Sequence, residues 1–221
     1  MEPMAAMLIG VEPQPGSGDS VPRWLWTAGV AGMALALGAM LTLLALLTAG
    51  WNSPRPVGPP DWQVAGQSIV LEAPLGETVL HLLPWSGDDF ALEAVAECLS
   101  GPSFNGLGLV FRAQDTEVYD VFAVGGDGYL AVLHFAGGVV TPLLPWQQFP
   151  HIRRGASENR LRLSCSQATC RFYVNDEYVD AVEYDATAGS IGVWATSPSD
   201  AQVTAAFTAI QVWEGVAPPS R

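Results

Sequence analysis

Residues 106–132 read GLGLVFRAQDTEVYDVFAVGGDGYLAV, and this stretch decides the fold. Apolar runs at 106–113, 118–124 and 129–134 are separated by a polar break and by the glycine-rich Gly125–Gly128 turn. Runs of about four to eight such residues are typical of strands, and a short glycine-rich turn joins antiparallel neighbours. The stretch therefore predicts three consecutive antiparallel strands.

The same pattern continues outward on both sides, across residues 62–214, and no long helical periodicity interrupts it. Short strands at regular spacing, separated by turn residues, are typical of a two-layer antiparallel sandwich or a barrel. We therefore expect an all-β domain. The further predicted strands are 68–72, 78–82, 89–99, 161–164, 170–174, 177–184, 190–196 and 203–213.

A different kind of segment precedes this domain. Residues 24–50 contain no charged residue and no proline, and they exceed the roughly 20 residues that a helix needs to cross a bilayer. Trp24, Trp26 and Trp51 lie at the two ends, where interfacial tryptophans are common. The segment predicts one transmembrane helix in contact with the lipid bilayer.

Two further features of this segment bear on its role. The small residues 48–50 leave open a cleaved signal peptide, although secretory apolar regions are usually only about 7–15 residues long. Small residues four apart allow close helix approach, which indicates a membrane-protein partner as one alternative. These pairs are Ala28 with Gly32 and Ala34 with Gly38.

The chain thus divides into five predicted parts. Residues 1–23 form a disordered tail, 24–50 the membrane helix and 51–61 a proline-rich spacer with four prolines. Residues 62–214 form the β-sandwich, and 215–221 a C-terminal tail. We expect a single-pass protein of the cell membrane, with a cytoplasmic N-terminus and an extracytoplasmic domain.

The charge balance excludes one class of partner. The chain has 22 acidic residues against 9 basic ones, a net charge of −13, and all nine basic residues are arginines. An acidic domain repels phosphate backbones, so we expect no nucleic-acid binding.

The three cysteines have different predicted states. Cys165 and Cys170 flank a four-residue loop between two predicted strands, a spacing that would let them face each other at disulfide distance. We therefore predict a Cys165–Cys170 bond, with two reduced cysteines as the alternative. Such a bond indicates an oxidising compartment. Cys98 shares strand parity with Phe90 and Leu92, which predicts a buried, unreactive thiol.

Four segments carry a resemblance to a known family. They are the opening stretch, then HIRRGASENRLRLSC at 151–165, RFYVNDEYVDAV at 171–182 and GSIGVWATS at 189–197. Together they resemble a bacterial concanavalin A-like jelly-roll family that includes LamG-like modules and 3-keto-disaccharide hydrolase-type domains. The resemblance implies two curved antiparallel sheets, and modules often attached to bacterial surface proteins.

Aromatic residues supply the candidate ligand site. Sugars stack on exposed aromatic faces, so we predict a groove lined by Tyr119, Tyr129 and Trp146 together with Arg112. The alternative is that these aromatics belong to the core, since large rings are usually well buried. Arg112 then pairs with a strand carboxylate.

Acidic residues give no clear catalytic or metal site. Glu93 and Glu97 share the solvent-facing side of one predicted strand. The compact Glu-x-Asp-x-x-Glu strand of sandwich-fold glucanases does not occur, since Glu183-Tyr184-Asp185 lacks the third acid. We therefore expect no enzyme activity, with a glycoside hydrolase as a weak alternative. No cofactor is expected either, although calcium at a loop remains open. The acidic residues concerned are Asp115, Glu117, Asp120 and Asp127.

The sequence therefore predicts a membrane-anchored, extracytoplasmic, lectin-like module for a carbohydrate or envelope ligand. Two alternatives remain: an accessory subunit of a membrane complex, and a sugar-processing hydrolase.

Overall fold

The structure is a computed structural model, and it describes residues 32–44, 55–56, 58–166, 168–184, 187–197 and 201–215. The chain separates into two compact units, Met1–Ala49 and Gly50–Arg221. The predicted N-terminal tail, 1–23, and residues 216–221 of the predicted C-terminal tail lie outside the described residues, as do positions 51–54 and 57 of the predicted spacer.

The first unit contributes one described helix, residues 32–44, inside the predicted 24–50 segment. Thr42 Oγ1 donates a hydrogen bond to the carbonyl of Gly38 at 2.9 Å within it. The rest of the predicted span lies outside the described residues. Within the described part of the chain, no helix has the length and apolar character required to cross a membrane.

The second unit is built from strands, with no helix in its described residues. Short apolar runs that alternate with turns suit strands, because successive side chains point to opposite faces. The strands are β1 (Trp62–Gln63), β2 (Ile69–Ala73), β3 (Thr78–Gly87), β4 (Phe90–Ser100), β5 (Gly106–Ala113), β6 (Val118–Val124), β7 (Tyr129–Ala136), β8 (Val139–Gln148), β9 (Asn159–Ser166), β10 (Thr169–Val174), β11 (Glu177–Glu183), β12 (Gly189–Thr196) and β13 (Val203–Glu214).

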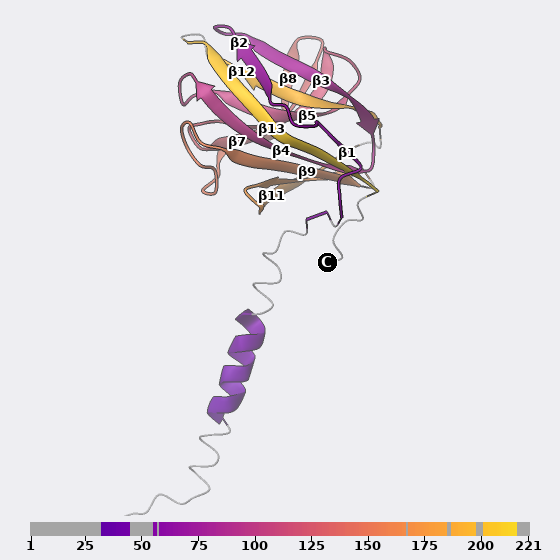
Figure 1. Cartoon of the computed structure of the whole chain (residues 1–221). Helices are drawn as coiled ribbons and strands as arrows, with labels where there is room; N and C mark the ends of the chain where they lie inside the picture. The colour runs from indigo at the N-terminus through magenta and orange to yellow at the C-terminus, as the bar shows by residue number, and fades with distance from the viewer. Residues whose placement is uncertain are drawn as a thin grey trace, which may run out of the picture. The chain divides into compact units, whose positions relative to one another are not determined.

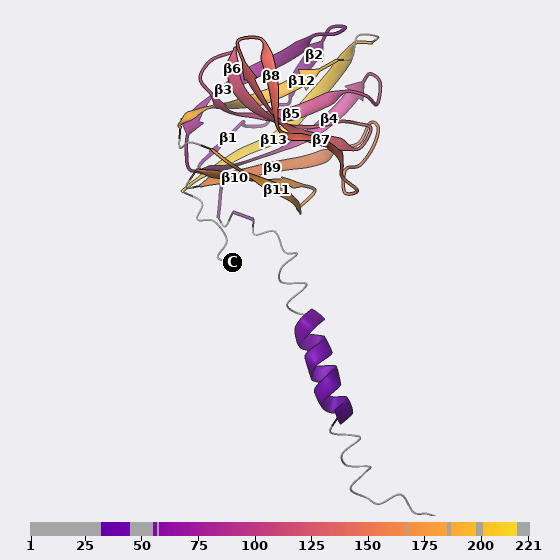
Figure 2. The same ribbon diagram turned by 180° about the vertical axis from the view of Figure 1, so that it is seen from behind.

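These strands form two antiparallel sheets that stack face to face (Figures 1 and 2). The first, sheet A, has the order β1-β13-β4-β9-β10-β11, with β2 also paired to β13. The second, sheet B, has the order β3-β12-β5-β6-β7-β8. The prediction of an all-β two-layer sandwich is therefore confirmed, and its architecture is jelly-roll-like.

The core lies between the sheets and follows the predicted alternation. On β4 the residues of one parity, from Phe90 through Leu92 to Cys98, are at most 5 % exposed. Phe111 and Phe122 of sheet B meet Phe172 of sheet A in this layer, with ring centroids 5.7 and 5.0 Å apart. The prediction of a buried Cys98 thiol is confirmed.

The hairpin of β9 and β10 contains the predicted disulfide. Cys165 and Cys170 are direct cross-strand partners, and their sulfur atoms are bonded. The following turn, Asn175-Asp176, has positive φ at both residues, as a tight hairpin turn requires. The prediction of a disulfide between Cys165 and Cys170 is confirmed.

One long strand was absent from the sequence predictions. β8 contains Pro142 and Pro145, which argue against a central strand because proline cannot donate a ladder hydrogen bond. In the structure β8 lies at the edge of sheet B, where β7 is its one partner among the described strands. Because an edge strand can contain proline, Pro142 and Pro145 are compatible with β8. Trp146 therefore lies on a strand.

Candidate functional site

The face of sheet B that points away from the core is apolar. It forms a second buried cluster around Trp194, which is 2 % exposed. The Tyr119 ring stacks on the Phe135 ring, with centroids 4.7 Å apart, and the centroids of the Phe135 and Trp194 rings are 6.1 Å apart. Large side chains therefore fill the middle of this face, so a ligand has no room there.

Glycines on β5 make room for this packing. A Cβ atom at Gly106 would lie 2.8 Å from a ring carbon of Trp194. At Gly108 it would lie 2.6 Å from the carbonyl oxygen of Phe122 on the neighbouring strand. The Trp194 indole therefore explains the glycine at 106, and the close approach of β6 explains the glycine at 108.

An open cavity of about 640 Å³ is formed where several strands of sheet B begin or end. We call it the aromatic pocket. The three aromatic residues that line it are well exposed: Phe104 at 72 %, Tyr129 at 40 % and Trp146 at 44 %. Its lining residues are Phe104, Asn105, Asp127, Tyr129, Trp146, Thr196 and Ser197.

Hydrogen bonds fix the polar residues of this pocket. In the Gly125–Gly128 turn, Gly128 N donates to the Gly125 carbonyl at 3.0 Å, and Tyr129 N donates to Asp127 Oδ1 at 3.2 Å. Asn105 Oδ1 accepts from Gly126 N at 3.1 Å, which ties the two loops together. The carboxylate and the amide are thus held beside the exposed rings.

The pocket combines ring faces with polar groups, an arrangement suited to a polyhydroxylated ligand. Most small-molecule sites are apolar cavities in which a few placed polar groups fix orientation. Asp127 is the one charged side chain among the described residues that line the pocket, and no arginine or histidine lines it.

Two of the four predicted site residues meet here, and two do not. Tyr129 and Trp146 line the aromatic pocket, whereas Tyr119 is only 5 % exposed and belongs to the buried cluster. Burial raises the pKa of the Tyr119 hydroxyl. Arg112 lines a different cavity.

Arg112 has the structural role that the sequence left open, an ion pair with a strand carboxylate. Its Nη1 atom lies 3.1 Å from Asp120 Oδ2, and its guanidinium carbon lies 4.2 Å from the centre of the Tyr184 ring. His134 Nδ1 approaches the other oxygen of Asp120 at 2.7 Å. Burial raises the pKa of Asp120, and its contacts with His134 and Arg112 oppose that shift only in part.

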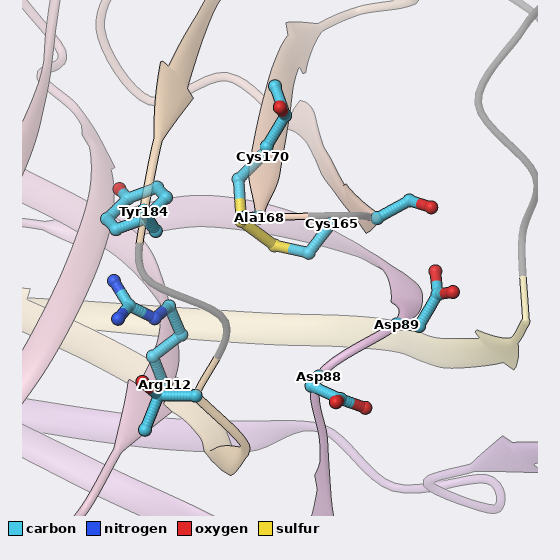
Figure 3. A pocket seen from close by; sticks show the side chains of 10 residues that line it. Asp88, Asp89, Arg112, Cys165, Ala168, Cys170 and Tyr184 are labelled. Atoms are coloured by element: carbon cyan, nitrogen blue, oxygen red, sulfur yellow. A yellow bond between two sulfur atoms is a disulfide. The ribbon is translucent and has the colours of Figure 1, made fainter.

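The cavity at Arg112 has a volume of about 220 Å³ and contains the disulfide in its lining (Figure 3). The Arg112 side chain extends toward Tyr184, while Asp88 and Asp89 lie on the other side of the view. Burial, and then the nearby charge of Asp120, raise the pKa of the Tyr184 hydroxyl. This cavity shares no lining residue with the aromatic pocket.

The two nominated acids lie on sheet A. Glu93 was predicted to be solvated, and this is wrong: its side chain is only 15 % exposed, because Arg160 lies beside it with Nε 3.5 Å away. Burial raises the pKa of Glu93, although Arg160 and Arg162 partly lower it. Glu97 is half-buried on the same face of β4. Neither residue lines the aromatic pocket.

The acids considered for calcium are dispersed. Asp115 accepts hydrogen bonds from the amides of Glu117 and Val118 at 2.7 and 2.8 Å. Asp120 is buried near the start of β6, and Asp127 follows its other end. Within the described ranges no group of three or more acids, cysteines or histidines is placed to hold a metal.

Sequence reasoning missed several residues of the pocket: Phe104, Asn105, Thr196 and Ser197. Phe104 carried a signal, since it is an isolated aromatic residue between Pro102 and Asn105 in a predicted loop. Thr196 carried none, because its place depends on the pairing of β12 with β5 and β3.

Comparison with known proteins finds solved structures that are similar to this chain. The carbohydrate-binding module CBM66 from Bacillus subtilis matches with a TM-score of 0.56 at 17 % identity, covering 69 % of this chain and 94 % of that one. Sheep galectin-11 matches with a TM-score of 0.43 at 13 % identity, over 63 % and 97 % of the two chains. A putative glycosyl hydrolase from Parabacteroides distasonis matches with a TM-score of 0.46 at 14 % identity, over 66 % and 86 %.

No protein-family model matches the sequence, and no curated protein matches it. The likeness to CBM66 therefore concerns the sandwich fold alone.

Proposed function

We propose that this chain is a membrane-anchored, extracytoplasmic binding module of the concanavalin A-like class, and that it holds a carbohydrate in the aromatic pocket without catalysing a reaction. The observation that carries the proposal is the exposure of Tyr129 and Trp146 beside the fixed carboxylate of Asp127. The rings supply stacking faces, and Asp127 and Asn105 supply partners for hydroxyl groups.

The content of the pocket favours binding over hydrolysis. A glycosidase needs two carboxyl groups about 5–10 Å apart at the scissile bond. Among the described lining residues the aromatic pocket has one, Asp127. Glu93 is engaged with Arg160 on the other sheet, so it does not supply the second.

The proposed location depends on the sequence and on the disulfide. Residues 24–50 are uncharged and long enough to span a bilayer. The bond between Cys165 and Cys170 is of a kind that persists in oxidising compartments. We place the sandwich outside the cytoplasm, with the N-terminus inside.

The test is a glycan array followed by calorimetry on the full-length chain, kept in a sugar-free detergent because residues 24–50 are apolar. We expect at least one glycan to bind. Trp146→Ala should weaken that binding roughly tenfold or more, since truncation of a central aromatic contact costs about 2 kcal/mol. The same glycan should release no reducing sugar on prolonged incubation.

Tyr178→Ala is the matched control. Tyr178 is an exposed aromatic residue on β11 of sheet A, at 52 % exposure, and it is absent from the pocket lining. Its variant should bind as the unmodified chain does. Absence of binding to every glycan, or equal loss in both variants, would contradict the proposed site.

A further inference from the structure

We infer that the sugar selected by the aromatic pocket carries a free, protonated amino group, so that the ligand is a cationic amino sugar rather than a neutral or acidic one. This inference rests on the proposed function. It is carried by the charge and the ring arrangement of the pocket.

The charge of the pocket comes from Asp127. Its Oδ1 atom accepts the Tyr129 amide, while the structure gives Oδ2 no hydrogen bond and the side chain no ion pair within the described residues. Arg154 packs against Gly128 of the same turn but does not line the pocket. An ammonium group placed here meets a carboxylate that has an oxygen available.

The aromatic rings of the pocket also favour a cationic ligand. Phe104, Tyr129 and Trp146 all line the pocket and are 72, 40 and 44 % exposed, so a ligand in the pocket can reach their rings. A cation within about 6 Å of an aromatic ring is attracted by the negative face of that ring. Three rings and one carboxylate together form a site that favours an ammonium over a hydroxyl.

The same features disfavour acidic sugars. A uronate or a phosphorylated sugar would bring a second negative charge beside Asp127, with no cationic side chain among the described lining residues to offset it. The net charge of −13 on the whole chain adds a weaker, long-range repulsion of anions and attraction of cations.

The experiment compares four hexasaccharide probes on the full-length chain in sugar-free detergent: glucosamine oligomer, its fully N-acetylated counterpart, a neutral glucose oligomer and a uronate oligomer. We expect the free-amine probe to bind at least tenfold more tightly than the N-acetylated one. That preference should shrink as salt is raised from about 0.05 to 0.5 M, because added ions screen the charge pair.

Asp127→Asn should remove the preference while retaining weak binding, since the amide oxygen can still accept the Tyr129 hydrogen bond and preserve the turn. Asp115→Asn is the control for loss of one negative charge, because Asp115 caps a different turn with its hydrogen bonds to Glu117 and Val118. Its variant should keep the full preference for the amine.

The outcomes separate the two proposals. Equal or stronger binding of the N-acetylated, neutral or uronate probe overturns the amino-sugar inference and leaves carbohydrate binding intact. A preference unchanged by Asp127→Asn also overturns it. Absence of binding to all four probes and to a broader glycan array refutes the proposed function, and the inference with it.

Discussion

The two sheets present opposite chemistry on the faces that point away from the core. Sheet B carries Trp194, Tyr119 and Phe135, and this apolar layer adjoins the open aromatic pocket through Thr196. Sheet A carries charged residues in the equivalent position, including Glu93 and Arg162. A face that keeps large aromatic residues next to an open cavity is the one suited to recognition.

The charged face of sheet A is satisfied by its own residues. Glu93 and Arg162 are direct cross-strand partners, and the Arg162 guanidinium carbon lies 4.4 Å from the centre of the Tyr173 ring. Arg162 is only 2 % exposed. Burial lowers the pKa of Arg162, and the charge of Glu93 opposes that effect. These contacts leave little of the charge available to a ligand.

The largest expected effect on stability comes from a substitution in the apolar layer of sheet B. Trp194→Ala should destabilise the domain by about 3–5 kcal/mol, because it removes a fully buried indole and leaves a cavity above Gly106. Urea unfolding followed by circular dichroism measures the loss. Phe104→Ala removes an exposed ring and should change stability by no more than about 0.5 kcal/mol.

If Trp194→Ala cost as little as Phe104→Ala, the outer face of sheet B would not be a second packed layer. The outer face of sheet B would then not differ between a packed centre and an open end. The reason for placing the ligand at the end of the sheet would be lost.

The sequence predicted most of the strands because their alternation is local. It missed β8 because Pro142 and Pro145 count against a strand unless its edge position is known, and edge position depends on pairing across the sheet. β3 also continues beyond its predicted end at residue 82, through Pro84 to Gly87, and it is the other edge of sheet B.

The candidate site was harder to predict for the same reason. The sequence does not separate Tyr119 from the pocket residues Tyr129 and Trp146. In the structure Tyr119 lies near the start of β6, away from the pocket, and stacks on Phe135. Arg112 has a positive φ of 53° and contacts Asp120, a conformation that strand alternation does not foresee. Strand alternation predicts which face of a sheet a side chain occupies, but it does not show which other residues pack over that face.

A smaller effect concerns the disulfide in sheet A. Replacing both Cys165 and Cys170 with alanine should lower stability by about 2 kcal/mol, because the bond closes only a short loop in the unfolded chain. A chemical-denaturation midpoint measured with and without reductant checks this. Reductant should shift the midpoint of the unmodified chain and leave the double variant unchanged.

A reductant effect that persists in the double variant would assign the stabilisation elsewhere, since Cys98 is the one other cysteine of the chain. A loss near the Trp194→Ala value would mean that sheet A depends on its covalent link as strongly as sheet B depends on packing.

The smallest effect concerns the exposed charges at the end of sheet A. Asp176 accepts a hydrogen bond from Arg55 Nε at 2.9 Å, and Arg160 Nη1 lies 3.8 Å from its other oxygen. Burial would raise the pKa of Asp176, but the hydrogen bond and charge of Arg55, together with the charges of Arg160 and Arg162, lower it overall. Because the folded pKa lies below the unfolded one, the ionised carboxylate stabilises the fold at neutral pH.

That contribution should be fully present above the unfolded pKa of about 3.9 and should disappear as the pH falls through the lower folded value. The side chains of Arg55 and Asp176 are 55 % and 38 % exposed, so solvent screening limits the effect to about 0.5 kcal/mol. Asp176→Asn should therefore be less stable than the unmodified chain at pH 7 and nearly equal to it near pH 2. Arg55→Gln should give a similar loss, and the double variant little more. A difference that is the same at both pH values would show that the charges at this end of sheet A do not contribute, and that the asparagine acts through the hairpin turn alone.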